Sequence, residues 1–235
     1  MDREEIVGLY EEIGAVFVKE IDQIQSDLAQ IKCFIFDWDG VFHQGTKYDG
    51  FKGSFSEPDS MGINLLRYSK YLISSEMPKM AIITGLKNST AKHFSEREKF
   101  DFQYQNFKEK SGALEHLLRH NNLKPSECAY FFDDLLDINV AEQVALRILV
   151  SHNANPYFSK WCEKKQFADY ITAHSGGFLA LREACEMLMA TQGNIDQVFM
   201  HRKNFDFSYK AYLQKKRDVQ LLVLEPKDIG LPEFL

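Results

Sequence analysis

Two aspartates one residue apart, Asp37 and Asp39, follow the apolar run of residues 31–36 and precede Gly40. A near-continuous apolar run is typical of a strand buried on both faces of a parallel sheet. Carboxylates this close repel each other, which raises the pKa of one of them unless a cation neutralises the pair. Oxygen ligands suit hard cations, so the spacing predicts a Mg²⁺ site. The alternative is a polar turn, because Asp and Gly are common turn residues.

A second apolar run, residues 80–83, ends in Thr84 and Gly85, and good helix-capping residues follow at 88–90. Helix N-termini attract anions because their backbone N–H groups are unpaired. We therefore expect Thr84 and Gly85 to face an anion site. An ordinary strand-to-helix turn is the alternative at this segment.

A third apolar run, residues 128–132, ends in a cluster of acidic residues: Asp133, Asp134 and Asp137. Acidic residues at a helix start can be simple caps. Three of them after a second strand are better explained by a site that they share with Asp37. Lys110 lies in the first turn of a helix expected over residues 108–120. The helix dipole disfavours lysine there, which indicates a nearby anion, although a surface lysine is the alternative.

Strand and helix patterns alternate from residue 31 to about 190, which predicts an α/β fold with a doubly wound, Rossmann-like parallel sheet. In such sheets the carboxyl ends of the strands meet at one crevice. Glycines between aromatic residues over 41–56 predict a β-hairpin flap beside that crevice. Aspartates, a hydroxyl and a lysine gathered there suit phosphoryl transfer, with carboxylate attack on phosphorus and charge stabilisation by Mg²⁺ and lysine.

The terminal segments show helical patterns outside this region. Residues 3–29 carry an apolar stripe that predicts one long helix, and we expect it to dock on its own domain rather than form a coiled coil. Residues 194–217 predict an aromatic-rich helix, and 219–224 an extended segment. We therefore divide the chain into an N-terminal helix (1–30), an α/β domain that carries the candidate phosphoryl-transfer residues (31–190) and a C-terminal extension (191–235).

Composition excludes several classes of protein. The formal net charge is −6 and no Lys/Arg-rich block occurs, which argues against nucleic-acid binding. No apolar stretch approaches the roughly 20 residues of a membrane span, and the acidic N-terminus is unlike a signal peptide. The four cysteines form no CxxC pair, so we expect buried, reduced thiols, with disulfides as the alternative. These features favour a cytoplasmic protein that binds no membrane.

The chain resembles the haloacid dehalogenase superfamily of phosphatases. The matching pieces are Asp37-Trp38-Asp39-Gly40-Val41, Ile83-Thr84-Gly85, Lys110 and Asp133-Asp134-Leu135-Leu136-Asp137, which occur in the expected order. Only a short flap lies between the first and second pieces, with no room for a large cap domain. That pattern is similar to the capless branch that includes the 3-deoxy-D-manno-octulosonate 8-phosphate phosphatases. Residues 54–63 and 175–183 are also similar to that branch.

The resemblance implies a role for each matching residue. It implies that Asp37 is the nucleophile and a Mg²⁺ ligand, and that Asp39 is the general acid/base, with its backbone carbonyl on the metal. It implies that Thr84 and the Gly85 amide hold the phosphoryl group and that Lys110 stabilises its charge. Asp133 would be a metal ligand, and Asp134 and Asp137 would either hold the metal ligands in place or bind the metal through water. Members of this branch are typically tetramers.

Three residues depart from the family pattern: Phe132 stands where glycine is usual, Leu86 where the sugar-acid enzymes often have a basic residue, and Phe178 where they tend to have arginine. These changes leave the phosphatase residues in place. They remove cations that would bind a substrate carboxylate.

The sequence therefore predicts a Mg²⁺-dependent phosphomonoesterase that acts on a small phosphorylated metabolite, a sugar or sugar-acid phosphate, through an aspartyl-phosphate. One alternative is a nucleotide or nucleotide-sugar phosphatase, in which Trp38 and Phe42 stack on a base. Another is a non-catalytic binding or assembly module that has kept the fold, which the apolar stripes of the terminal segments suggest.

Overall fold

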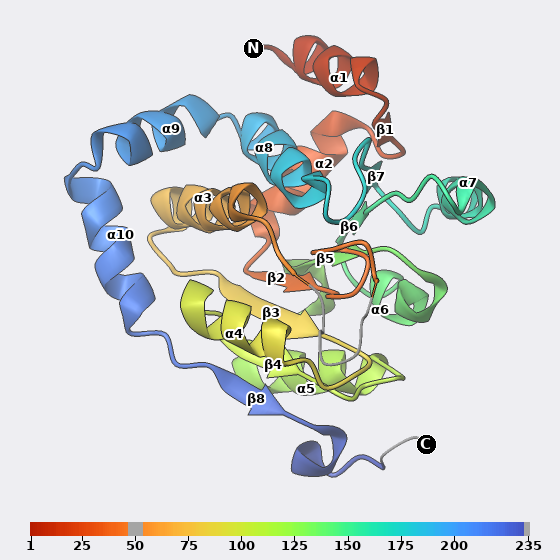
Figure 1. Cartoon of the computed structure of the whole chain (residues 1–235). Helices are drawn as coiled ribbons and strands as arrows, with labels where there is room; N and C mark the ends of the chain where they lie inside the picture. The colour runs from red at the N-terminus through yellow and green to blue at the C-terminus, as the bar shows by residue number, and fades with distance from the viewer. Residues whose placement is uncertain (47–53, 233–235) are drawn as a thin grey trace.

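The computed structural model describes residues 1–46 and 54–232, which build one eight-stranded sheet with helices on both faces (Figure 1). In spatial order the strands are β1 (Val16–Phe17), β7 (Tyr170–Ile171), β6 (Leu146–Leu149), β5 (Cys128–Phe132), β2 (Cys33–Phe36), β3 (Lys79–Ile83), β4 (Phe102–Tyr104) and β8 (Leu222–Leu224). Neighbouring strands are parallel except β1, which runs antiparallel to β7. The predicted α/β fold is confirmed.

Strand order places a topological switch at β2. From β2 the chain proceeds to β3 and β4 on one side, and then returns to β5 on the other side of β2. Crevices form outside the carboxyl ends of strands at such a switch, because the following connections leave in opposite directions. The residues that follow β2, β3 and β5 therefore share one edge of the sheet.

Helices cover both faces because the strands alternate their side chains between two cores. In β2, Phe34 and Phe36 pack with α2 (Ile21–Gln30), α3 (Glu57–Ser74), α4 (Ser89–Glu98) and α8 (Ala180–Gln192). Cys33 and Ile35 face the other core, which α5 (Ser111–Asn121), α6 (Ile138–Ala141) and α7 (Pro156–Lys165) complete. All four β2 side chains are fully buried, as their apolar run predicts.

The single N-terminal helix predicted over 3–29 is wrong. The structure has α1 (Arg3–Glu12) and α2, with β1 between them. Gly14 adopts a φ of +103°, which only glycine enters readily, and the chain turns there to pair β1 with β7. The apolar stripe nevertheless packs on its own domain as expected, since Tyr10 and Ile24 are buried in the same core.

The C-terminal helix predicted over 194–217 is also divided, into α9 (Ile195–Asn204) and α10 (Phe207–Arg217). Phe205 adopts a left-handed φ of +48°, and Asp206 then caps α10 by accepting a hydrogen bond from the Tyr209 amide. These helices pass around the outside of α3 and deliver β8 to the sheet edge (Figure 1). The expected extended segment is therefore a strand of the sheet.

Other expectations concern the flap and the thiols. Residues 47–53 of the predicted β-hairpin flap lie outside the described residues. Only residues 41–56 separate the first aspartate motif from α3, so no large cap is inserted there. The four cysteines are buried and free, as predicted. Among the described residues, no helix is both long and apolar enough to cross a membrane.

Candidate active site

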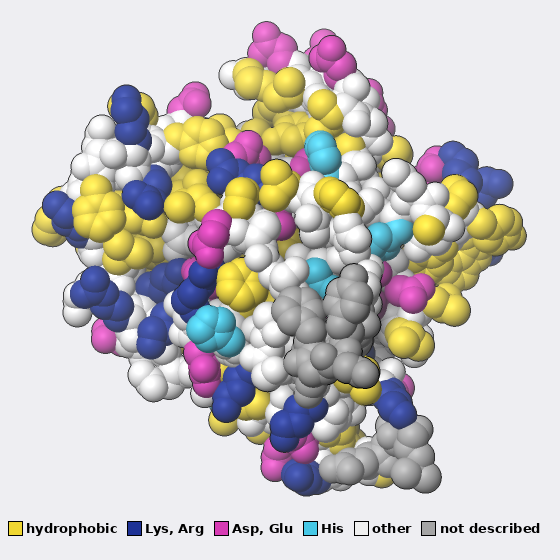
Figure 2. Space-filling model, viewed as in Figure 1, with side chains coloured by type: hydrophobic (Ala, Val, Ile, Leu, Met, Phe, Trp, Pro, Cys, Tyr) yellow, Lys and Arg dark blue, Asp and Glu magenta, His cyan; other side chains and the backbone are white. Residues whose placement is uncertain are grey.

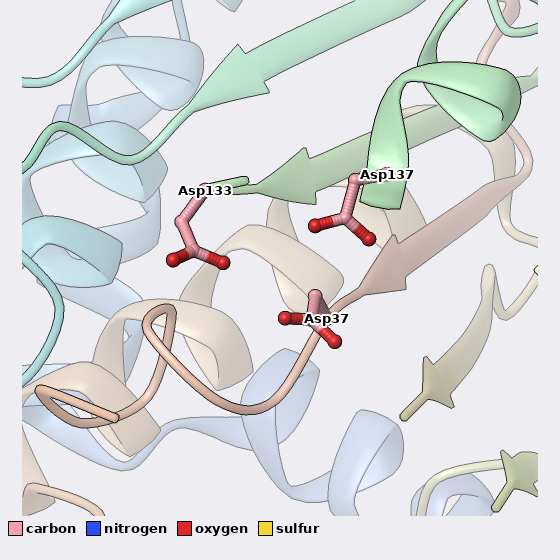
Figure 3. A group of neighbouring side chains, drawn as sticks. All are labelled: Asp37, Asp133 and Asp137. Carbon is pink, nitrogen blue, oxygen red and sulfur yellow. The ribbon is translucent and has the colours of Figure 1, made fainter. Parts of the chain in front are cut away.

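Three carboxylates from different segments meet at the carboxyl ends of β2 and β5. Asp37 follows β2, Asp133 follows β5, and Asp137 ends the short 3₁₀ helix η2 (Leu135–Asp137). A set of their oxygen atoms, one from each, lies within 4.8 Å of one another, and Figure 3 shows the three side chains around a common centre. The convergence expected from the strand ends is therefore present.

The three aspartates open into a cavity of about 350 Å³. Its lining combines acidic, basic and apolar side chains from the predicted motifs: Asp37, Asp39, Gly85, Leu86, Lys108, Lys110, Asp133, Asp134, Leu136 and Asp137. Every predicted site residue except Thr84 lines this cavity. The sheet edge thus forms one pocket, rather than separate turns.

Lys110 joins the carboxylates from the start of α5, where it is the N-cap residue. Its Nζ donates to Asp37 Oδ1 and to Asp137 Oδ1, at 2.5 Å in each case. The residue is only 4% exposed. Burial alone would lower the pKa of Lys110, but the two carboxylates outweigh burial and raise the pKa above its usual value. Lys110 therefore stays charged, and Asp37 and Asp137 are the nearby anions that its position at the start of a helix indicated.

Tyr130 holds the other side of Asp137. This β5 residue is fully buried, and its hydroxyl donates to Asp137 Oδ1 at 2.5 Å. The Asp134 backbone N–H donates to Asp137 Oδ2 at 3.4 Å, so both oxygens of this carboxylate have donors. The Asp134 side chain instead caps η2 by accepting from the Leu135 amide at 2.7 Å. Asp137 is thereby fixed in one orientation beside Lys110.

The acidic cluster fits a hard divalent cation. Burial raises the pKa of Asp37 well above its usual range, Lys110 opposes this shift, and Asp137 and Asp133 add to it. Burial also raises the pKa of Asp133, against a hydrogen bond from His152 that lowers it. Oxygen atoms from three carboxylates, with one lysine between two of them, carry excess negative charge that a cation relieves. The donor set is the all-oxygen kind that Mg²⁺ takes.

Asp39 lies at the cavity beside a buried histidine. His43 Nε2 is 3.1 Å from Asp39 Oδ1, and the Gly45 backbone N–H donates to His43 Nδ1 at 3.1 Å. The Asp39 side chain stays 26% exposed. Gly40, between Asp39 and the flap, has a φ of +87°, and a Cβ there would lie 1.9 Å from Asp133 Oδ2. Glycine therefore allows the Asp37–Asp39 turn to approach the end of β5.

Thr84 and Gly85 differ in their access to the cavity. Gly85 lines it, whereas Thr84 is fully buried and its hydroxyl makes no hydrogen bond with the described residues. The helix N-terminus expected to attract the anion is already capped, since Asn88 Oδ1 accepts from the Thr90 and Ala91 amides at 3.0 Å. An anion at this edge of the sheet would therefore be bound by the loop that follows β3, rather than by the capped N-terminus of α4.

Sequence reasoning missed three residues of the site: His43, Tyr130 and His152. His152 Nε2 is 3.1 Å from Asp133 Oδ2, which raises the pKa of the histidine. His152 follows β6, so the strand-end rule applied to Asp37 and Asp133 could have pointed to it. Nothing in the sequence distinguishes the Tyr130 hydroxyl from any other core tyrosine.

The departures from the family pattern fall into two groups. Phe132 is buried and stacks on Tyr130 with ring centroids 5.7 Å apart, so the core accommodates it. Leu86 and Phe178 are exposed. Trp38 and Phe42 are buried and stack on each other, with centroids 4.5 Å apart. The expectation that they could stack on a substrate base is therefore wrong.

No model of a protein family matches the chain. Among curated proteins, the 3-deoxy-D-manno-octulosonate 8-phosphate phosphatase KdsC of Escherichia coli (strain B / BL21-DE3) is 31% identical over 178 residues, which cover 74% of this chain and 87% of the relative. KdsC of Yersinia pestis is 30% identical over 179 residues, covering 74% and 88%.

Solved structures agree with these relatives. The phosphatase of the same name from Yersinia pestis gives a TM-score of 0.60 at 30% identity, over 74% of this chain and 89% of that one. The Moraxella catarrhalis phosphatase, solved with magnesium ion, phosphate ion and KDO, gives a TM-score of 0.63 at 26% identity, over 76% and 97%. The chain belongs to the haloacid dehalogenase superfamily of phosphatases, in the branch without a large cap that includes the 3-deoxy-D-manno-octulosonate 8-phosphate phosphatases.

Proposed function

We propose that this phosphatase hydrolyses the phosphomonoester of a small metabolite, of the sugar or sugar-acid phosphate class, with Asp37 as nucleophile. The observation that carries the proposal is the gathering of Asp37, Asp133, Asp137 and Lys110 in one cavity. Relatives named for a sugar-acid phosphate support the substrate class.

The proposed reaction has two displacements at phosphorus. An oxygen of Asp37 attacks phosphorus, the bond to the leaving alcohol breaks, and Asp39 gives that alcohol its proton. A water molecule then loses a proton to Asp39 and attacks the aspartyl-phosphate, which releases inorganic phosphate and restores Asp37. Lys110, held by two carboxylates, stabilises the phosphoryl charge, and Thr84 and the Gly85 amide bind phosphoryl oxygens.

We propose Mg²⁺ as the cofactor, held by Asp37, Asp133 and the Asp39 carbonyl, with Asp134 and Asp137 outside the first ring of ligands. The bound ion would neutralise charge on the phosphoryl oxygens. The three-carboxylate group and the magnesium complex of the Moraxella catarrhalis protein support this choice. Both oxygens of Asp137 already accept hydrogen bonds, Oδ1 from Lys110 and Tyr130 and Oδ2 from the Asp134 amide, which supports an indirect role for Asp137.

The proposed chemistry lies within residues 31–190, to which the terminal segments 1–30 and 191–235 add edge strands.

We also propose a homo-oligomer, a tetramer by family resemblance, and a cytoplasmic location. Figure 2 shows hydrophobic side chains at two flanks, over α9–α10 and over α7, where Phe207 is 86% and Tyr157 84% exposed. Such exposed aromatics suit subunit contacts. Four free, buried cysteines suit a reducing compartment.

A phosphate-release screen tests the proposed function. The full chain is assayed on a panel of sugar, sugar-acid and nucleotide phosphates, with Mg²⁺, with chelator, and with Mg²⁺ restored after chelator. We expect release from sugar-type phosphates that chelator abolishes and Mg²⁺ restores. Absence of release from every phosphomonoester, or release that chelator leaves unchanged, would overturn the proposal.

A further inference from the structure

Two exposed leucines stand on the walls of the active-site cavity. Leu86 follows β3 and is 50% exposed, and Leu136 lies in η2 after β5 and is 66% exposed. Because β3 and β5 flank β2 on opposite sides, the two leucines come from opposite sides of Asp37. Apolar walls above a few placed polar groups are what a ligand pocket presents to the uncharged part of its ligand.

The charge of the cavity likewise favours a ligand whose remaining part is uncharged. In the part of the chain that the structure describes, five aspartates line the cavity, together with two lysines, Lys108 and Lys110. Lys110 is buried and donates hydrogen bonds to Asp37 and Asp137, whereas Lys108 is exposed. With a bound divalent cation and with Asp39 protonated as the general acid, the described lining has no net positive charge. A phosphomonoester adds negative charge, so a second anionic group in the substrate gains no attraction from this lining.

From these walls and this charge, and on the basis of the proposed function, we infer that the substrate's leaving group is uncharged and lays an apolar face against Leu86 and Leu136. Within the broad class of sugar and sugar-acid phosphates, this selects neutral leaving groups over carboxylated ones. The C–H face of a neutral sugar or another neutral alcohol fits the leucines. Among the described residues that line the cavity, a carboxylate finds no guanidinium to pair with.

Matched substrate pairs test the inference. Benzyl phosphate is compared with 4-carboxybenzyl phosphate, and glycerol 3-phosphate with 3-phosphoglycerate, since the members of each pair differ in one carboxylate. For the full chain with Mg²⁺, we expect kcat/KM to be about tenfold or more higher for the neutral member of each pair. Equal values, or higher values for the carboxylated members, would overturn the inference.

Variants assign the preference to the two leucines. Leu86→Arg and Leu136→Arg each place a guanidinium in the cavity, and we expect each to reduce the neutral-to-carboxylated ratio of kcat/KM by about tenfold. Leu135→Arg is the matched control, because Leu135 is 60% exposed next to Leu136 but does not line the cavity. An unchanged ratio in both cavity variants, or an equal change in the control, contradicts the assignment.

The outcomes separate this inference from the proposed function. If none of the four compounds releases phosphate, although the screen on sugar-type phosphates succeeded, the neutral apolar leaving group is wrong and the phosphatase stands. If neither assay releases phosphate, the proposed function itself fails. Release from the neutral members with the expected ratios supports both.

Discussion

At the scale of single residues, the site depends on a chain of short contacts that runs from Tyr130 through Asp137 and Lys110 to Asp37. Each link is 2.5 Å long, and all four residues are buried. In a buried site such contacts fix side chains in one arrangement, because an unpaired charge there is costly. Asp37 is therefore oriented by Lys110, whose position depends in turn on Asp137 and on Tyr130, which does not line the cavity.

We predict that Tyr130→Phe lowers kcat by about tenfold while KM changes little, because Asp137 and Lys110 lose a fixed position that matters mainly in the transition state. Steady-state kinetics check this. The matched control is Tyr104→Phe, a fully buried tyrosine of β4 whose hydroxyl bonds to His116 at 2.9 Å rather than to the site. Equal losses of kcat in the two variants would show that Tyr130 acts through general stability alone.

At the scale of elements, β8 and the turn after it reach two parts of the site. Glu225, directly after β8, accepts hydrogen bonds from Gln105 at 3.1 Å and from Lys87 at 3.3 Å. Lys87 belongs to the loop that follows Gly85. Leu231 packs closely on Gly112 in the first turn of α5, two residues after Lys110. The C-terminal segment therefore braces both the loop after β3 and the helix that carries the lysine.

We predict that Glu225→Ala raises KM for phosphomonoesters and the inhibition constant of inorganic phosphate by about threefold, with a smaller change in kcat. The loop after Gly85 loses a partly exposed contact, which is worth about 1 kcal/mol or less. Glu96→Ala is the control, because Glu96 pairs with Lys92 on the exposed surface of α4 at 3.7 Å. A loss confined to kcat, or equal effects in the two variants, would contradict the bracing role.

A buried lysine joins two helices on the other side of the molecule. Lys70 of α3 is 4% exposed, and its Nζ donates to the Leu28 carbonyl at 2.6 Å, near the end of α2. Burial lowers the pKa of Lys70 to about 8. Between that pH and the usual lysine pKa, the folded protein has released a proton that the unfolded chain still holds. The free energy of unfolding therefore rises with pH across this window.

We predict that the free energy of unfolding of wild type, minus that of Lys70→Met, increases by about 1–2 kcal/mol between pH 7 and pH 10. This range of free energies is smaller than the full pKa shift of Lys70 would imply, because the cavity beside Lys70 is open to solvent. Urea unfolding at the two pH values measures it. Lys203→Met, at an exposed position of α9, should show no such change. A difference for Lys70→Met that is independent of pH would contradict the lowered pKa.

At the scale of the whole molecule, the sequence predicted the sheet and the meeting of its motifs because both follow from simple regularities. Buried parallel strands are continuous apolar runs, and their carboxyl ends share an edge, so Asp37 and Asp133 could be placed together without any contact information. The order of the motifs along the chain then matched a family with a known site.

Other features could not be predicted because they depend on tertiary contacts. Gly14 weakens a helix only mildly by propensity, yet it turns the chain because β1 finds an edge of the sheet beside β7. Phe205 adopts a left-handed φ between α9 and α10, and the only local signal of that break is Asp206, a good capping residue that could equally stand inside a helix. The role of Tyr130 arises only when η2 folds Asp137 back over β5. The hydrophobic pattern of the sequence predicts where helices and strands form, whereas the contacts that end or connect these elements depend on tertiary packing.

We propose that Asp37 is the group that attacks phosphorus. The most direct measurement is phosphate release by Asp37→Asn at saturating Mg²⁺, per mole of protein shown to be folded by circular dichroism and urea unfolding. The control is Asp101→Asn, a buried aspartate that pairs with Arg67 and Lys79 at the amino end of β4, away from the cavity. We predict a loss of at least about a thousandfold for Asp37→Asn, and most of the turnover retained by folded Asp101→Asn. A folded Asp37→Asn protein that keeps most of its phosphate release would contradict the account.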